Sequence, residues 1–239
     1  METNEILDDL QNGYYIYQNA DGFKFGIDAV LLSDFAKTVT GNVIDLCTGT
    51  GIIPILLAAK SNAEHIDAVE IQEQMAEMAE RSVIYNNLSD RIHIKCCDLK
   101  DATKYYGKSV FDAVTVNPPY MRAGSGLLNG DDLKTISRHE IKCNLDDVIK
   151  ASSDLLKPHG KMFMVHRPQR LAEIFYYMHK YKVEPKIMRL VAPSEGREVN
   201  LVLVLVIKCA KSDLKVLPTL YVYDDNGNYT KEIDEIYGR

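Results

Sequence analysis

From residue 41 onward, short apolar runs alternate with stretches in which apolar positions recur every three or four residues. The short runs predict strands and the periodic stretches predict helices. The expected strands are Val43–Cys47, His65–Glu70, Arg91–Cys96, Phe111–Val116, Lys161–Val165, Lys186–Val191 and Val199–Ile207. The expected helices are Ile52–Lys60, Glu73–Asn86, Leu145–Leu156 and Pro168–Met178, with a turn at Lys157–Gly160. This alternation predicts an α/β fold, a mostly parallel seven-stranded sheet with an antiparallel last strand and helices on both faces.

The two ends of the chain carry different patterns. Tyr15–Tyr17 and Phe23–Phe25 flank a turn, which predicts a β-hairpin, and a helix over Asp28–Lys37 is expected to follow. A turn signal at Asp225–Gly227 predicts a second small hairpin. We expect a single domain, with a hairpin and helix in residues 1–40, the core in 41–211 and a C-terminal hairpin or tail in 212–239.

Ligands of open α/β sheets bind beyond the carboxyl ends of the strands, so the residues at those ends carry the functional prediction. The first strand, which contains Asp45, leads into Cys47–Gly51, whose glycines let the backbone turn tightly and approach a ligand. The acids Glu70 and Asp98 stand at the ends of the next two strands. The fourth strand stops at Asn117-Pro118-Pro119-Tyr120, because two prolines cannot continue a ladder. These residues are expected to meet at one edge of the sheet.

The residues of this edge favour S-adenosylmethionine over a nicotinamide dinucleotide. Pro54 stands where the third glycine of G-x-G-x-x-G would be, and Asp45 would lie beside a pyrophosphate and repel it. A ligand with a ribose, an ammonium group and no phosphate fits better, and Glu70 suits a bidentate contact to ribose hydroxyls. A nucleotide-dependent dehydrogenase is therefore disfavoured.

At these positions the sequence resembles the class I S-adenosylmethionine-dependent methyltransferases, specifically the amino-methylating branch with the motif (D/N/S)PP(Y/F). It is more similar still to the bacterial tRNA1(Val) adenine-N6 methyltransferases over Gln18–Phe35, Asp45–Ala58 and Asn117–Tyr120. The resemblance implies a Rossmann-like class I methyltransferase fold and methylation of adenine 37, beside the anticodon of a tRNA. One position departs from D-x-G-x-G-x-G: Cys47 replaces the first glycine, and we expect it to avoid positive φ.

The resemblance also implies a role for individual residues. The catalytic residues would be Asn117, Pro118 and Tyr120, and the base would lie against Pro119 and Tyr120. The cofactor would be bound by Phe25, Gly26, Asp28, Asp45, Cys47, Thr48, Gly49, Gly51, Glu70, Ile71, Asp98, Leu99 and Asn117. Asp28 alone would also suit the start of the helix that follows it.

Asn-Pro-Pro-Tyr suits methylation of an amine for a chemical reason. The exocyclic nitrogen of adenine is a poor nucleophile because its lone pair is delocalised into the ring. In the resemblance, the Asn117 side-chain oxygen and the Pro118 carbonyl accept its two N–H groups and favour tetrahedral geometry, which is electrostatic preorganisation. Tyr120 would stack on the base, which leaves its neighbours more easily in a single-stranded loop than in a duplex.

Charge gives only local evidence for RNA. The formal net charge is −6, yet residues 157–211 hold more Lys and Arg than Asp and Glu, as a phosphate-contacting surface would. Within this stretch, the loop Pro193–Arg197 lies between the two final strands. Arg197 is the candidate RNA contact.

Several classes of site and protein are not expected. The five cysteines include no C-x-x-C pair, which argues against structural zinc and a disulfide framework. His139-Glu140 has no partner at ligand spacing, so no metal is expected, and Met121–Gly130 is a candidate loop over the base. The acidic N-terminus is no signal peptide, and no run of about 18 apolar residues exists, so we expect a cytoplasmic protein without membrane spans.

Other functions remain as alternatives. A glutamine-N5 methyltransferase acting on a protein release factor uses the same acceptor pair, but only about 40 residues precede the first core strand, too few for the helical domain such enzymes carry. A DNA adenine methyltransferase would need a target-recognition domain, and none is evident. A non-catalytic module that binds S-adenosylmethionine or RNA would not need Asn117 and Tyr120. Oligomeric state is left open.

Overall fold

The computed structural model describes residues 5–10, 13–20, 25–120 and 144–238. Its strands are β1 (Glu5–Asp9), β2 (Tyr15–Asn19), β3 (Thr40–Leu46), β4 (Asn62–Glu70), β5 (Ile92–Cys96), β6 (Phe111–Val116), β7 (Leu156–His166), β8 (Val183–Ala192), β9 (Leu201–Lys208) and β10 (Lys215–Tyr221). Its α-helices are α1 (Ile27–Phe35), α2 (Ile52–Lys60), α3 (Glu73–Tyr85), α4 (Ala102–Tyr106), α6 (Leu145–Leu155), α7 (Leu171–Lys180) and α8 (Lys231–Tyr237), and two 3₁₀ turns are η1 (Leu99–Asp101) and η2 (Pro168–Arg170). Most core elements fall within a few residues of the predicted ranges.

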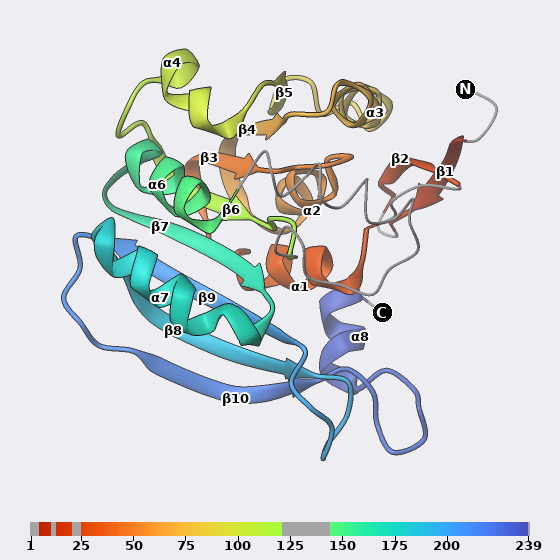
Figure 1. Ribbon diagram of the computed structural model, residues 1–239. Helices are drawn as coiled ribbons and strands as arrows, with labels where there is room; N and C mark the ends of the chain where they lie inside the picture. Colours follow the sequence, from red (N-terminus) through yellow and green to blue (C-terminus); the bar gives the residue numbers. More distant parts are fainter. Residues whose placement is uncertain (1–4, 11–12, 21–24, 121–143, 239) are drawn as a thin grey trace, which may run out of the picture.

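The central sheet has the strand order β10-β8-β9-β7-β6-β3-β4-β5 (Figure 1). β5, β4, β3, β6 and β7 run parallel, and β9 is antiparallel to both β7 and β8, as the absence of a helix between the last two predicted strands indicated. The carboxyl ends of the parallel strands therefore meet at one edge, hereafter the carboxyl edge.

Helices cover both faces of this sheet, and the alternation of side chains along each strand explains why. In β3, Val43 belongs to one buried apolar cluster and its neighbour Ile44 belongs to the other. The first cluster contains α1 and α2 residues, and the second contains α6 and α7 residues. Because successive side chains of a strand point to opposite faces, a strand buried on both sides reads as a continuous apolar run.

The sheet has eight strands in the described part of the chain, and the prediction of seven was therefore wrong. The additional strand, β10, lies at the edge and pairs in parallel with β8. Its register shifts between Leu217 and Leu220, around Pro218, which has no N–H to donate. A proline-containing edge strand lacks the alternation and the apolar run that mark inner strands, so this segment was assigned to a tail.

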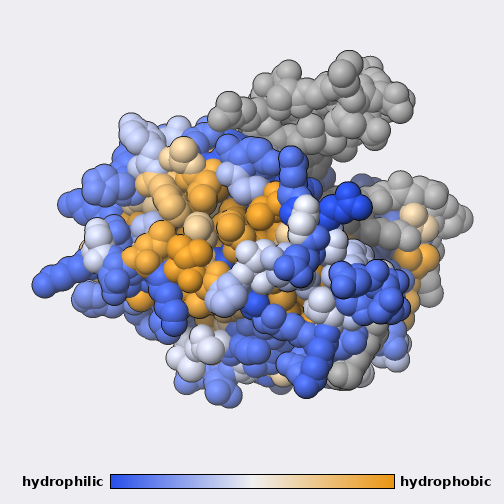
Figure 2. All heavy atoms as spheres, turned by 90° about the horizontal axis from the view of Figure 1, so that it is seen from below, coloured by the Kyte–Doolittle hydropathy of each residue, from blue (hydrophilic) through white to orange (hydrophobic). Residues whose placement is uncertain are grey.

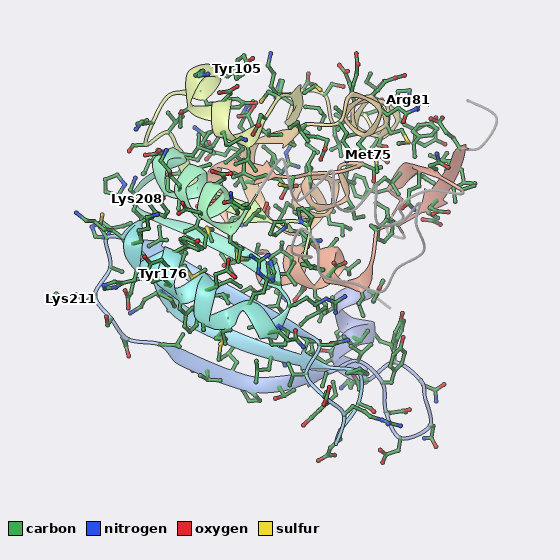
Figure 3. The ribbon with its side chains drawn as sticks, in the orientation of Figure 1. Met75, Arg81, Tyr105, Tyr176, Lys208 and Lys211 are labelled. Atoms are coloured by element: carbon green, nitrogen blue, oxygen red, sulfur yellow. The ribbon has the colours of Figure 1, made fainter. Side chains whose placement is uncertain are left out.

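The N-terminal hairpin includes a strand that the sequence pattern did not predict. β2 pairs antiparallel with β1. The expected partner, Phe23–Phe25, lies mostly outside the described residues. Arg81 of α3 binds Glu5 of β1 through two N–H···O bonds of 2.6 and 2.8 Å, and Figure 3 shows Arg81 on the side of α3 that faces the hairpin. The Ser82 hydroxyl accepts the Tyr17 N–H at 3.0 Å. The hairpin is thus attached to the core through α3.

Two further turns differ from expectation. Lys157–Gly160, expected as a turn, belongs to β7. The strand is irregular there, because His159 has a φ of 64° and the register against β6 shifts. At the C-terminus, a single antiparallel bridge between Tyr223 and Tyr229 closes the Asp225–Gly227 turn, and the chain then forms α8, which the sequence pattern did not predict. α8 packs on α1.

No helix among the described residues is long and apolar enough to cross a membrane. Figure 2 views the molecule from below Figure 1, where β10 is the lowest strand, and shows apolar side chains gathered over part of this face. Two exposed apolar residues are Val216, in β10, and Leu214, just before this strand.

Candidate active site

The glycine loop leaves the carboxyl edge between β3 and α2. The Thr48 N–H donates to the Val69 carbonyl at 3.0 Å, which holds the loop against the neighbouring strand β4. Gly49 and Gly51 have φ values of 58° and 87°. Cys47 has a φ of 60°, so the expectation that it avoids positive φ was wrong. The chain must turn sharply after buried Leu46, and a left-handed residue achieves this at a cost of roughly 1–2 kcal/mol for a side chain with a β-carbon.

Glu70, at the end of β4, is bound to the glycine loop. Its Oε2 accepts the Gly49 N–H at 2.9 Å and its Oε1 accepts the Gln72 N–H at 2.9 Å. The residue is 5% exposed, so these bonds satisfy a buried carboxylate. Each carboxylate oxygen keeps a second lone pair, so the group can still accept bonds from a ligand hydroxyl.

Asp45 lies within β3 and is fully buried. Its Oδ1 accepts the Thr115 hydroxyl at 2.6 Å, while Oδ2 has no hydrogen-bond partner among the described residues. Burial raises the pKa of Asp45 to about 7, against the lowering effects of the Thr115 and Thr48 hydroxyls. The arrangement favours a positively charged ligand group nearby, because a cation stabilises the carboxylate that burial disfavours.

The other expected cofactor residues at this edge differ in accessibility. Ile71 directly follows Glu70 and its side chain is 36% exposed. Asp98 begins η1, where its Oδ1 accepts the Lys100 N–H at 2.9 Å and its Oδ2 lies 3.2 Å from the Lys100 ammonium. Leu99 is buried in the apolar cluster beneath, so only its backbone is a candidate for a ligand contact.

Asn117-Pro118-Pro119-Tyr120 follows β6 directly. Leu46 of β3 pairs with Val116 of β6, so the glycine loop and this tetrapeptide leave the sheet side by side. Pro118 is buried, whereas Asn117, Pro119 and Tyr120 are partly accessible.

Asp28 of α1 connects the N-terminal segment to this tetrapeptide. Its Oδ2 accepts the Asn117 Nδ2–H at 3.3 Å and also contacts the Tyr120 hydroxyl, which lies equally close to Asn117 Oδ1. The hydroxyl has one proton, and a carboxylate is the stronger acceptor. Burial and the Asp28 charge raise the pKa of Tyr120, so the phenol keeps that proton. Asn117 Oδ1 is then left with acceptor capacity.

His166 and Arg167, at the end of β7, hold the Tyr120 ring. The rings of Tyr120 and His166 meet edge to face at 5.2 Å, and the Arg167 guanidinium carbon lies 5.0 Å from the Tyr120 ring centroid. The His166 ring is fully buried, its Nδ1 accepts the Arg167 N–H at 2.7 Å, and burial lowers its pKa to about 4. His166 was not among the residues expected from the sequence, although its position at the end of the fifth core strand was a signal for it.

Phe25 and Gly26 precede α1. The Phe25 N–H donates to the Gln18 side-chain oxygen at 2.9 Å, and Gln18 in turn donates to Asp8 of β1. Gly26 is the N-cap residue of α1 and is exposed. A β-carbon at Gly26 would lie 2.7 Å from Asp28 Oδ1, so glycine here leaves room for the Asp28 carboxylate.

Some basic residues of 157–211 lie at the carboxyl edge, where the parallel strands end, and others lie at the opposite end of the strands. Arg167, Arg170 and Arg197 lie at the carboxyl edge, after β7 and between β8 and β9. Arg197 is exposed. Lys157, Lys180 and Lys208 lie at the opposite edge, bound to Asp112, Asp146 and backbone carbonyls. Only some of the Lys and Arg residues of this stretch therefore lie at the same end of the strands as Asn117–Tyr120.

Two expectations cannot be placed on the fold. Met121–Gly130 and His139-Glu140 lie outside the described residues.

The residues present fit S-adenosylmethionine on two observations. A β-carbon at Gly49 would meet no atom within 4 Å, so open space lies over the loop where a ligand can approach the backbone. Buried Asp45 Oδ2 lacks a partner in the described part of the chain, next to that loop. A ligand that has hydroxyls and a positive charge satisfies both features.

Two glycine variants test whether S-adenosylmethionine binds over the glycine loop. Gly51→Ala should lower the free energy of unfolding by about 1–3 kcal/mol, because its φ is 87° and the added methyl would lie 3.2 Å from the Ala79 β-carbon. Gly49→Ala should cost only about 1 kcal/mol of stability but weaken S-adenosylmethionine binding, because the methyl fills the open space. Denaturant unfolding and calorimetric titration measure the two effects.

The matched control is Gly227→Ala, at a φ of 80° with nothing within 4 Å and far along the chain from the loop. It should lose about as much stability as Gly49→Ala and bind S-adenosylmethionine as the wild type does. Equal affinity of the Gly49 and Gly227 variants for S-adenosylmethionine would show that the cofactor does not bind over the glycine loop at Gly49.

The chain matches the model of one protein family, the methyltransferase small domain, over residues 25–182. It is also similar to proteins named tRNA1(Val) (adenine(37)-N6)-methyltransferase. With that of Porphyromonas gingivalis it shares 30% identity over 175 residues, which are 70% of this chain and 68% of the relative. With that of Phocaeicola vulgatus it shares 29% identity over 218 residues, 89% of this chain and 90% of the relative.

Solved structures show the same fold. A predicted O-methyltransferase from Agrobacterium tumefaciens, Atu636, aligns with a TM-score of 0.71 at 24% identity, over 88% of this chain and 95% of that one. TYW2 of M. jannaschii in complex with AdoMet aligns with a TM-score of 0.60 at 15% identity, over 87% of each chain. At these identities the likeness concerns the fold alone.

Proposed function

The chain belongs to the methyltransferase small domain family, and from this premise we propose that it transfers a methyl group from S-adenosylmethionine to the N6 amine of an adenine in tRNA. The observation that carries the proposal is the position of Asn117–Tyr120, which leaves β6 beside the glycine loop after β3. The relatives named tRNA1(Val) (adenine(37)-N6)-methyltransferase support adenine 37 of the anticodon loop as the target. We expect the enzyme to act in the cytoplasm, where its substrate tRNA is found.

The cofactor end of the site is assigned to the glycine loop and two acids. S-adenosylmethionine supplies, when bound, a methyl group on a positively charged sulfur. Glu70 presents carboxylate lone pairs suited to ribose hydroxyls, and it also holds the Gly49 amide in place. Asp45 is buried beneath the loop, and a positively charged ligand would stabilise its carboxylate form. Together these residues select a ligand that combines hydroxyls with a positive charge.

The acceptor end of the site is assigned to Asn117 and Pro118. Asn117 Oδ1 and the Pro118 carbonyl accept the two N–H groups of the amine and turn its lone pair out of conjugation with the ring. Asp28 orients Asn117 by accepting its Nδ2–H, which leaves Oδ1 for the substrate. The two prolines fix the direction of the Pro118 carbonyl. These dipoles are set before reaction, which is the form of electrostatic stabilisation that enzymes use most. The amine's proton passes to solvent after transfer.

Tyr120 supplies a ring on which the flipped base stacks. His166 and Arg167 restrict the orientation of that ring, so we assign both as positioning residues. Arg197, exposed at the same edge, is proposed to contact RNA phosphate.

Methyl transfer from labelled S-adenosylmethionine to unmodified bulk tRNA tests the proposal, with bulk DNA and release factor assayed in parallel. We expect label only in tRNA, recovered after digestion as N6-methyladenosine. Label in the release factor would replace the substrate with a glutamine side chain while keeping the acceptor chemistry. Absence of label from every substrate, with the cofactor still bound, would overturn the assignment as an enzyme.

A further inference from the structure

Three potential metal ligands converge on the outer strands of the sheet. His65 and Asp67 are two residues apart in β4, so their side chains point to the same face. His93 of β5 is the direct pairing partner of Asp67 across the parallel ladder. The local pairing of two strands therefore brings together two imidazoles and one carboxylate.

The distances between these groups are short. His65 Nε2 lies 3.3 Å from Asp67 Oδ2, and the two imidazole rings have their centroids 4.5 Å apart at an interplanar angle of 31°. One ligand atom from each residue lies within 4.8 Å of the other two. In a tetrahedral zinc site with bonds of about 2.0–2.2 Å, the ligand atoms lie roughly 3.3–3.6 Å apart. The imidazoles of His65 and His93 are not buried, so rotation of these side chains can bring the ligand atoms to that spacing.

Charge and burial also favour a cation here. The Asp67 side chain is only 12% exposed, and its Oδ2 lies 3.3 Å from His65 Nε2, so the carboxylate is held among the two imidazoles. The Tyr106 phenol of α4 lies near the Asp67 carboxylate, in the place of an outer partner to a metal ligand. Lys95 lies two residues after His93 in β5, on the same face, and its ammonium lies over the Tyr105 ring at 4.6 Å. Tyr105 is labelled on α4 in Figure 3.

We propose that His65, Asp67 and His93 bind a divalent transition-metal ion such as Zn²⁺. Two imidazoles and one carboxylate suit Zn²⁺, Co²⁺, Ni²⁺ or Cu²⁺, whereas Mg²⁺ and Ca²⁺ prefer oxygen ligands. The site lies within the strands, before Glu70 at the carboxyl end of β4, and it is independent of the proposed methyl transfer. An ion there ties the edge strand β5 to β4, so it stabilises the folded protein by mass action.

Titration of the untagged, chelator-treated protein with Co²⁺ tests the site. We expect one equivalent to bind, with the visible absorption of Co²⁺ in a nitrogen and oxygen environment, and Zn²⁺ to displace it. His93→Asn and Asp67→Asn should each weaken binding by at least about tenfold, the lower end of the loss seen when even an outer partner of a ligand is removed. His179→Asn, which changes an exposed histidine of α7, is the matched control and should bind as the wild type does.

A thermal melt provides the second readout. Zn²⁺ should raise the melting temperature of the wild type and of His179→Asn, and leave that of His93→Asn unchanged. Because His93 is exposed, His93→Asn should fold even if Asp67→Asn does not. Absence of stoichiometric binding by the wild type, or equal affinity in His93→Asn and His179→Asn, would overturn the proposal.

Discussion

Asn117→Ala should lower the rate of methyl transfer by about 100- to 1,000-fold, the loss typical for removing one donor or acceptor aimed at a reacting group. The alanine leaves the amine with one acceptor, so its lone pair stays conjugated with the adenine ring for longer. S-adenosylmethionine binding should be retained, because the glycine loop and Glu70 hold each other through the Gly49 amide at 2.9 Å. Single-turnover methylation of tRNA and calorimetric titration of the cofactor give the two quantities.

The control for this variant is Asn228→Ala, which changes an exposed asparagine of the Tyr223–Tyr229 turn. It should leave rate and affinity at wild-type values. Unchanged turnover in Asn117→Ala would exclude the acceptor role. A parallel loss of cofactor binding would show instead that Asn117 acts in holding the cofactor.

The succession of core strands and helices along the chain was predictable from the sequence, because the patterns that mark these elements are local. Apolar runs and periodic stretches mark each element, and the rule that ligands bind beyond strand ends then selects Glu70, Asp98 and Asn117 without any knowledge of contacts. β10 escaped prediction because an edge strand with a proline is defined by its neighbour β8 and not by its own pattern.

The details of the site depend on contacts between distant segments, which no single segment encodes. Asp28 and Tyr120 meet only because α1 packs beside the end of β6, and His166 reaches the Tyr120 ring only because β7 lies next to β6. The conformation of Cys47 has the same origin. Its left-handed backbone follows from the turn between β3 and α2, although a residue with a β-carbon avoids that region by itself.

Tyr120→Ala should lower kcat/KM for tRNA by about 5- to 150-fold, since stacking of a base on an aromatic ring contributes ~1–3 kcal/mol. Tyr120→Phe keeps the ring against His166 and Arg167 and loses only the hydroxyl contact with Asp28, so its effect should be clearly smaller. Steady-state kinetics with tRNA as the varied substrate measure both. The affinity of the two variants for S-adenosylmethionine should not fall in the same order as their kcat/KM.

The control is Tyr176→Ala. Tyr176 is labelled on α7 in Figure 3. It is 65% exposed, so its loss should not change kcat/KM. If Tyr120→Phe were as impaired as Tyr120→Ala, the hydroxyl and its bond to Asp28 would be the important feature of this residue, and stacking would not. The pair of variants therefore separates two roles that the same side chain combines. A ring on which a base stacks must be oriented before the base arrives. Its contacts with Asp28 of α1 and with His166 and Arg167 at the end of β7 provide that orientation from two separate parts of the chain.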